Sequence, residues 1–271
     1  MSSKKPNLED LDSIKLHNLL VEATIHKKYK LIKQILDFNN INIYYKHNNT
    51  SCFELMLKTN DKKLYKLLTK YLNLTIKMLD LALYSNLDFI KYLFSKTVID
   101  HNTCDATGNN ALNIAICRAK IDIVKFLLKQ NYNPNQLNLK HESSFMLAVI
   151  KNNFPMVLTI HKYSTYEIIT TFKDNGDRTL LHHAVLVNNL KMVEFLINTL
   201  KVNINSTDMQ GRTALIYSVI YDYDKITELL LKAPHIDYYI KDNNDKSVLQ
   251  YAINNKNEKM ITLLNSYNIY L

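Results

Sequence analysis

Glycine is scarce in this chain of 271 residues, where only Gly108, Gly176 and Gly211 occur. Phosphate-binding loops need closely spaced glycines, because their backbone must approach the ligand. Three isolated glycines therefore exclude a P-loop or a G-x-G-x-x-G site. The G-x-S-x-G and H-E-x-x-H motifs are also absent. We expect a protein that is not an enzyme, with no catalytic residues, no cofactor and no metal.

Cysteine and long apolar runs are also in short supply. The chain has three cysteines, Cys52, Cys104 and Cys117, and no two of them have C-x-x-C spacing. An odd number without this spacing argues against a disulfide framework or a zinc site. We expect reduced, mostly buried thiols, as in a cytoplasmic protein. Residues 1–12 lack an apolar signal core, and no stretch reaches the roughly 18 apolar residues of a membrane span. A soluble, monomeric protein without a membrane partner is predicted.

Arginine is rare despite a formal net charge of +9, since all but three of the 34 basic residues are lysines. Proteins that read nucleic-acid bases usually rely on arginine for bidentate contacts. Two lysine clusters remain candidates for an acidic partner: Lys27, Lys28, Lys30 and Lys33, and then Lys58, Lys62, Lys63, Lys66 and Lys70. A run of charge is more often a solvated helix face. Binding of nucleic acid or another polyanion through these lysines is the weaker hypothesis.

Four segments share one template of a polar turn, a hydroxyl or amide residue, and a short apolar stretch. They are residues 105–115, 174–184, 208–218 and 242–252. Amphipathic segments with helical spacing follow at 122–128, 191–197 and 224–231. Aligned on the hydroxyl or amide position, the repeats are marked by Asn18, Thr50, Lys77, Asn110, Ser143, Thr179, Thr213 and Ser247. Most intervals between these marks lie near 33 residues, the period of one repeat class.

These segments resemble the ankyrin pattern D-x-x-G-x-T-P-L-H-x-A followed by h-V-x-x-L-L, and the resemblance extends from about Leu16 to Leu271. It implies an all-α ankyrin-repeat solenoid of about eight stacked helix-turn-helix units with short finger turns. A single domain over residues 14–271 is expected, after a short mobile arm at 1–13. Its repeats start near residues 14, 46, 74, 105, 138, 174, 208 and 242.

The resemblance assigns a role to each repeated position. The residue at the mark caps the first helix, a leucine two positions on enters the core, and an alanine five positions on lets the neighbouring helix approach. His182 matches the family histidine and is expected to bridge backbone groups of adjacent fingers, with His183 on the surface. The intervals predict a clipped connection at residues 70–75 and a longer loop at 163–171.

Finger turns and exposed first-helix positions line the concave face of ankyrin stacks. The fold does not need these side chains, so they are free to specify a partner. The resulting candidates are Arg118, Lys140, Lys151, Arg178, Met209, Gln210, Arg212, Tyr221 and Lys246. Among them Met209, Arg212 and Tyr221 form the predicted hot spot, because arginine and aromatic residues dominate interface energetics.

The predicted function is therefore a non-enzymatic protein–protein interaction module that binds its partner through the concave face. The departures from the ankyrin pattern, such as Asp177 and Asp245 in place of glycine, resemble those of ankyrin proteins from large DNA viruses and intracellular bacteria. That likeness implies a pathogen protein acting on a host regulator, in the host cytoplasm. The alternatives are the polyanion binding described above and a regulatory subunit of an enzyme complex.

Overall fold

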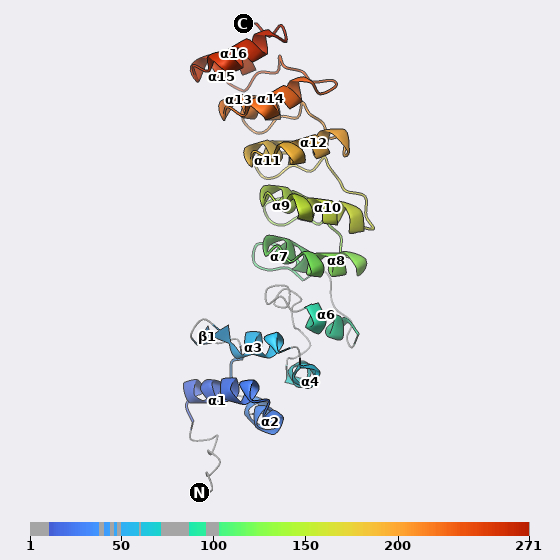
Figure 1. The fold of residues 1–271 in the computed structure, drawn as a ribbon, viewed down its shortest axis with the longest axis vertical. Coiled ribbons are helices and arrows are strands. Elements are labelled where there is room, and N and C mark those ends of the chain that lie inside the picture. Colours follow the sequence, from blue (N-terminus) through green and yellow to red (C-terminus); the bar gives the residue numbers. More distant parts are fainter. Residues whose placement is uncertain are drawn as a thin grey trace. The chain divides into compact units, whose positions relative to one another are not determined.

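The computed structural model describes residues 11–37, 41–43, 46–47, 50–59, 61–71, 87–95 and 103–270. The chain forms two compact units, residues 1–103 and residues 104–271, called here the N-terminal unit and the C-terminal unit (Figure 1). Within the described segments, no helix is both long and apolar enough to span a membrane.

The N-terminal unit consists of short helices around an aromatic core. Its described helices are α1 (Ser13–Ile25), α2 (Tyr29–Asp37), α3 (Cys52–Lys58), α4 (Lys62–Tyr71) and α6 (Leu87–Phe94), and two short strands, β1 (Lys46–His47) and β2 (Thr50–Ser51), pair antiparallel before α3. Helix α1 packs on α2 and α3, and α4 packs on α2, α3 and α6. The ring of Phe89 lies 6.5 Å from that of Phe53 and 4.8 Å from that of Tyr65.

Two helix starts in this unit differ from the sequence prediction. Helix α1 is capped by Asp12, whose carboxylate accepts from Lys15 N at 2.7 Å, so Asn18 lies inside the helix. Ser51 caps α3 by accepting from Glu54 N at 3.1 Å, because Thr50 is still paired with His47 in the strands. In both cases a competing cap residue nearby is used instead of the predicted one.

Three other predictions fall largely outside the described residues. These are the arm at 1–13, the clipped connection at 70–75 and the repeat mark at Lys77. The predicted single domain and its repeat starts remain predictions.

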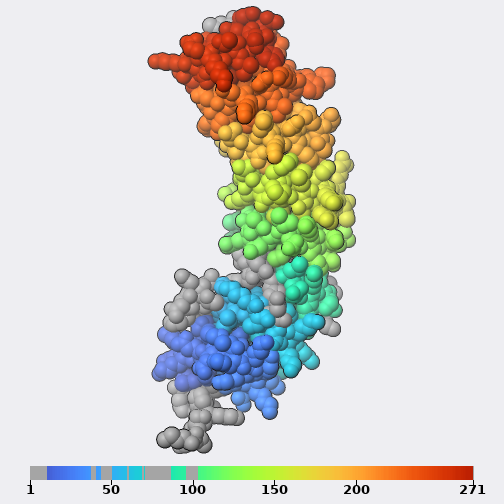
Figure 2. Space-filling view, viewed as in Figure 1, coloured from blue at the N-terminus to red at the C-terminus, as the bar shows by residue number. Residues whose placement is uncertain are grey.

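The C-terminal unit is a regular stack of helix pairs. Its helices are α7 (Ala111–Cys117), α8 (Ile121–Lys129), α9 (Ser144–Ile150), α10 (Phe154–Tyr163), α11 (Leu180–Leu186), α12 (Leu190–Asn198), α13 (Ala214–Ile220), α14 (Asp224–Leu231), α15 (Val248–Asn254) and α16 (Glu258–Asn265). Each first helix packs on its second helix and on the first helix of the next pair, and successive pairs touch in the space-filling view (Figure 2). Helices this short are marginal alone, so contact between repeats stabilises them.

The predicted capping positions begin the first helices of this unit. Asn110, Ser143, Thr179, Thr213 and Ser247 are their N-caps. The hydroxyls of Ser143, Thr213 and Ser247 accept from the backbone N–H three residues on, at 3.1, 3.2 and 3.3 Å. The leucine and alanine positions are equally regular, since Leu215 is 1% exposed and Ala184 is fully buried. The local signals of the repeat therefore act as expected in this unit.

A left-handed corner joins the two helices of every pair. It falls nine residues after the capping residue, and its occupants are Ala119 (φ 54°), Asn152 (φ 52°), Asn188 (φ 51°), Asp222 (φ 56°) and Lys256 (φ 54°). None of these residues is glycine, although glycine adopts this conformation without steric cost.

The connection after α10 has no helix between Tyr163 and Leu180, but it is as long as the connection between Leu231 and Val248, so the predicted longer loop at 163–171 is not distinctive. The side chain of Asn135 holds it from the preceding repeat, donating to Glu167 O at 2.7 Å and accepting from Ile169 N at 3.0 Å. Asn205 makes the same pair of bonds to His235 O at 2.7 Å and Asp237 N at 2.9 Å. Asparagine amides suit this task because each provides a donor and an acceptor.

Candidate protein-binding surface

The finger turns that precede the first helices of the C-terminal unit share one hydrogen-bond pattern. In each finger, one side-chain oxygen accepts from the backbone N–H groups two and four residues on, at 2.8–2.9 Å. The residues that provide this oxygen are Asp105, Asn138, Asp174, Asp208 and Asp242. Each finger is thus closed by its own aspartate or asparagine.

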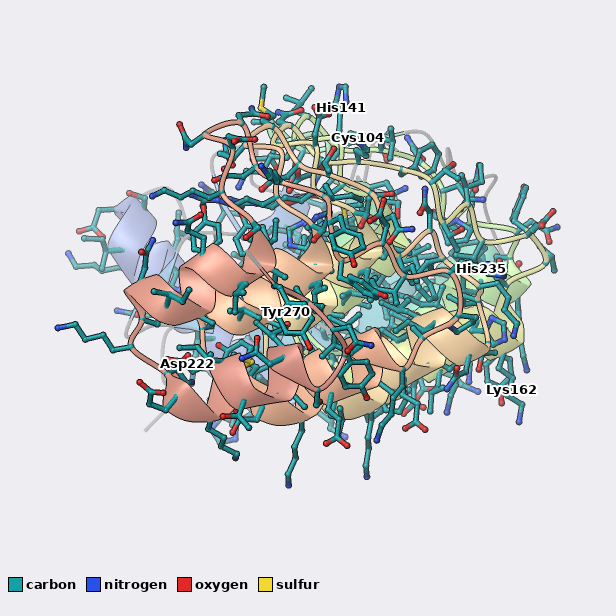
Figure 3. The ribbon with its side chains drawn as sticks, turned by 90° about the horizontal axis from the view of Figure 1, so that it is seen from above. Cys104, His141, Lys162, Asp222, His235 and Tyr270 are labelled. Carbon is teal, nitrogen blue, oxygen red and sulfur yellow. The ribbon has the colours of Figure 1, made fainter. Side chains whose placement is uncertain are left out.

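Successive fingers are also joined to one another. Leu139 N donates to Thr107 O at 3.0 Å, Asn175 N to Lys140 O at 3.2 Å, Met209 N to Gly176 O at 3.0 Å, and Asn243 N to Gln210 O at 2.9 Å. The five fingers therefore form one hydrogen-bonded ladder from residue 105 to residue 246. In the view down the stack, His141 of the second finger lies at the edge of the molecule, beyond the helices (Figure 3).

The second carboxylate oxygen of three finger aspartates binds a ring on the first helix. His183 Nε2 lies 2.9 Å from Asp174 Oδ2, while the hydroxyls of Tyr217 and Tyr251 donate to Asp208 and Asp242 at 2.6 and 2.5 Å. The three rings occupy the same position, four residues after the capping residue. His183 is only 8% exposed, so the prediction that it lies on the surface is wrong: its pairing with Asp174 compensates its burial.

His182 bridges neighbouring fingers, as predicted from the ankyrin resemblance. Its Nδ1 lies 3.1 Å from Thr179 N, and its Nε2 lies 2.9 Å from the carbonyl oxygen of Arg212 in the next finger. The ring is 1% exposed. This role is structural.

Burial lowers the pKa of both His182 and His183 below the ordinary value of 6.5, against the opposing effects of the Arg212 carbonyl on His182 and the Asp174 carboxylate on His183. Burial alone would raise the pKa of Asp174, but the N–H donors of Arg178 and Gly176, together with His183, hold it below its ordinary value. Both histidines are therefore neutral at pH 7, and His183 lies next to an ionised Asp174.

These shifts predict that stability falls in mild acid. As the pH drops below about 6.5, the unfolded chain takes up protons that the folded histidines resist, so the free energy of unfolding decreases. Asp174 contributes only at much lower pH. Tyrosine occupies the position of His183 in the next two repeats. His183→Tyr should therefore reduce the loss of unfolding free energy between pH 7 and about 5.5. Urea titrations at both pH values measure this loss, and an equal loss in the variant would show that His183 does not cause the acid sensitivity.

Aromatic and cationic side chains gather around the last two first helices, α13 and α15. The ring of Tyr217 stacks on that of Tyr221 at 6.3 Å, and Tyr221 stacks on Tyr223 at 5.7 Å. The guanidinium of Arg212 lies 5.9 Å from the ring centroids of both Tyr217 and Tyr251, within the range of cation–π attraction.

The predicted contact residues fall in two groups. Lys140, Arg178, Met209, Gln210, Arg212 and Lys246 lie in the fingers, whereas Arg118, Lys151 and Tyr221 are the C-caps of α7, α9 and α13. Met209 and Tyr221 are 58% and 49% exposed. Tyr217 connects the two groups, because it contacts Arg212 on one side and Tyr221 on the other.

Sequence reasoning missed Tyr217, Tyr223 and Tyr251 as members of this cluster. A signal for two of them was present, because Tyr217 and Tyr251 stand at the same position of consecutive repeats, nine residues after an aspartate. Their contacts with Arg212 could not be inferred from that spacing alone.

The cysteines form no nucleophilic site in the described residues. Cys52 Sγ lies 3.5 Å from His17 Nδ1, but both side chains are buried, and burial raises the pKa of the Cys52 thiol to about 12. At neutral pH it is therefore protonated and unreactive. The expectation of mostly buried thiols is wrong, since Cys104 and Cys117 are exposed at the ends of turn and helix segments. No cluster of metal-binding side chains occurs in the parts of the chain that the structure describes.

The predicted lysine clusters lie in the turn before α2, on α2, at the end of α3 and on α4, with their side chains exposed. Some of their charge is engaged locally: Lys27 Nζ lies 3.8 Å from Asp61 Oδ2, and Lys63 Nζ lies 5.3 Å from the Tyr29 ring centroid.

Comparison with known proteins agrees with this geometry. A family model described as "Ankyrin repeats (3 copies)" matches residues 78–171, 145–242 and 181–270, which together span more than half of the chain. The chain belongs to the ankyrin repeat family. The predicted all-α ankyrin-repeat solenoid is thereby confirmed, and ankyrin repeats are generally protein–protein interaction modules.

Several solved ankyrin structures resemble the chain. The ankyrin repeat protein EF0377 matches with 23% identity and a TM-score of 0.65, over 70% of this chain and 97% of its own. An ankyrin repeat domain, ABAYE2397 from Acinetobacter baumannii AYE, matches with 21% identity and a TM-score of 0.64, over 70% and 97%.

A third match comes from the predatory endopeptidase Bd0816 of Bdellovibrio bacteriovorus in complex with the immunity protein Bd3460. It has 26% identity and a TM-score of 0.61, over 71% of this chain and 98% of the matched chain. No curated protein sequence matches the chain.

Proposed function

We propose that this ankyrin protein is a monomeric, non-enzymatic module that binds a protein partner through the fingers and first-helix ends of its C-terminal unit. The observation that carries the proposal is that Met209 and Tyr221 are exposed, at 58% and 49%, in the part of the stack where Tyr217 and Arg212 join finger and helix end. Large apolar side chains of this kind contribute most of the energy at protein interfaces.

The ladder of finger hydrogen bonds supports this placement. Each finger is closed by its own aspartate or asparagine and is bonded to the next finger, so the exposed side chains are held in place before a partner arrives. Such preorganisation reduces the entropy lost on binding. A regulatory subunit of an enzyme complex would be one form of the same function, with the enzyme as partner.

The narrower form of the proposal is a pathogen protein that acts on a host regulator in the cytoplasm. Its support is the divergence from the ankyrin pattern, with Asp177 and Asp245 in left-handed turn positions that usually hold glycine. Affinity purification from the natural source, followed by mass spectrometry, identifies the partner and decides between these forms.

Removing the two apolar contacts together is expected to weaken binding of the purified partner strongly. Each hot-spot residue contributes about 2 kcal/mol or more, so Met209→Ala combined with Tyr221→Ala should cost about 4 kcal/mol and raise Kd by roughly 800-fold. Isothermal titration calorimetry measures the change, and the thermal midpoint should move by only a few degrees.

The matched control combines Leu158→Ala with Tyr270→Ala, an apolar and an aromatic residue that are also exposed, at 42% and 63%. Leu158 lies on a second helix and Tyr270 at the end of the stack, so Kd should not change. If the control pair weakened binding and the finger pair did not, the interface would lie elsewhere.

A further inference from the structure

A column of positive charge runs along the last three fingers. Arg178, Arg212 and Lys246 each stand immediately before the capping residue of a first helix, so they occupy equivalent positions in consecutive repeats. The two preceding fingers carry Asn109 and Glu142 at this position. The column is therefore confined to one end of the finger ladder.

Within residues 103–270, no carboxylate forms an ion pair with this column. Across residues 103–270, neither arginine nor Lys246 forms an ion pair within 4.0 Å. The aspartates that close these fingers are fully engaged, with one oxygen on backbone N–H groups and the other on His183, Tyr217 or Tyr251. Asp177 and Asp245 are exposed beside Arg178 and Lys246, but Asp245 pairs with Lys241 rather than with Lys246. The three cations are thus available to an external anion.

The middle cation is held in a defined place. The guanidinium of Arg212 lies 5.9 Å from the ring centroids of both Tyr217 and Tyr251. Lys246 Nζ lies 5.9 Å from the same Tyr251 ring. The Nε atoms of Arg178 and Arg212 are buried without a hydrogen-bond partner, so an incoming carboxylate would have to reach the other nitrogens of each guanidinium.

We propose that Arg178, Arg212 and Lys246 bind an extended acidic segment of the partner protein, with carboxylates at every third residue. This inference rests on the proposed function and names the chemistry of the partner. Packed helices lie about 8–10 Å apart, and three residues of extended chain span about 10 Å. One glutamate or aspartate in three therefore matches one cation per repeat, with charge-assisted hydrogen bonds to the arginines.

A peptide fits this column better than a nucleic acid does. A nucleic-acid strand carries a phosphate about every 3.4 Å along the axis, so most phosphates would meet no cation. They would also approach the exposed carboxylates of Asp177 and Asp245, which stand one residue before Arg178 and Lys246. Glutamates spaced one per repeat avoid the first penalty, because each carboxylate meets a cation.

Two fluorescein-labelled peptides test the proposal on the full chain by fluorescence anisotropy. Both are twelve-residue Gly/Ser/Asn peptides with three glutamates, placed at positions 4, 7 and 10 in the first and at adjacent positions in the second. The spaced peptide should bind at least about tenfold more tightly, a difference of 1.4 kcal/mol. Arg212→Gln should weaken its binding by about tenfold, and Arg178→Gln, Arg212→Gln and Lys246→Gln together should abolish it.

The control removes the same charge from second helices, through Lys162→Gln, Lys191→Gln and Lys225→Gln, which should leave the spaced peptide bound. Circular dichroism verifies the fold of both triple variants. Equal binding of the two peptides, or loss in the control alone, would overturn the proposal. So would a twelve-residue oligothymidylate that binds more tightly than the peptide and depends on the same column, since it would identify a polyanion site.

The outcome is separable from that of the proposed function. If the spaced peptide does not bind, but the double variant Met209→Ala with Tyr221→Ala still loses the natural partner, only the proposed acidic segment is wrong. If both assays fail, the fingers are not the interface.

Discussion

Leu215→Ala is expected to lower the free energy of unfolding of the C-terminal unit by about 2–5 kcal/mol, the usual range for a buried leucine. Leu215 is 1% exposed in α13, which packs on α11, α14 and α15. Truncation leaves a cavity in the middle of the stack that these helices cannot fill without moving. Urea unfolding followed by circular dichroism measures the loss.

Leu139→Ala is the matched control, because Leu139 is 68% exposed at a finger tip. Its truncation should change stability by less than about 0.5 kcal/mol, as for other surface positions. Equal losses in the two variants would mean that Leu215 does not pack as the structure places it.

Gly211→Ala is expected to destabilise the same region by about 2–3 kcal/mol. Part of this is the left-handed φ of 74°, which costs a residue with a side chain about 1–2 kcal/mol. The rest is steric: a Cβ would lie 2.8 Å from Asn243 N and would collide with the Asn243 side chain. The finger bond from Asn243 N to Gln210 O, worth about 1 kcal/mol, would be displaced.

Gly176→Ala separates the two contributions. Gly176 is not in the left-handed region, and a Cβ there would meet only side-chain atoms, the nearest being Asp174 Oδ1 at 3.3 Å. The loss of unfolding free energy should be much smaller than for Gly211→Ala. Comparable losses would show that the close approach of adjacent fingers is not what constrains Gly211.

The regular part of the fold was predictable because its signals are local. A capping hydroxyl or amide, a leucine two residues on and an alanine five residues on all act within one short helix. The prediction was least accurate in the N-terminal unit, where several cap residues compete. Asp12 starts α1 upstream of Asn18, and the β1–β2 pairing shifts the start of α3 to Ser51. Such competition is decided by contacts that one sequence does not reveal.

The candidate surface was predictable as a set of positions but not as a structure. Arg212 and Tyr221 could be placed on the exposed side of the repeat from the register alone. That Tyr217 lies between them, and that Tyr251 contacts both Arg212 and Lys246, depends on the spacing between repeats. His183 was misplaced for a related reason, since its partner Asp174 lies nine residues away across the finger.

The left-handed corners between paired helices have a consequence for engineering this scaffold. Asparagine and aspartate tolerate such corners fairly well, but Ala119 and Lys256 have no side-chain group that compensates locally. These two residues lie in separate repeats without shared contacts, so relief of strain at one would add to relief at the other. Substitutions that relieve this strain would raise the thermal midpoint of the chain. Because both positions lie away from the fingers, such substitutions would not alter what the fingers bind.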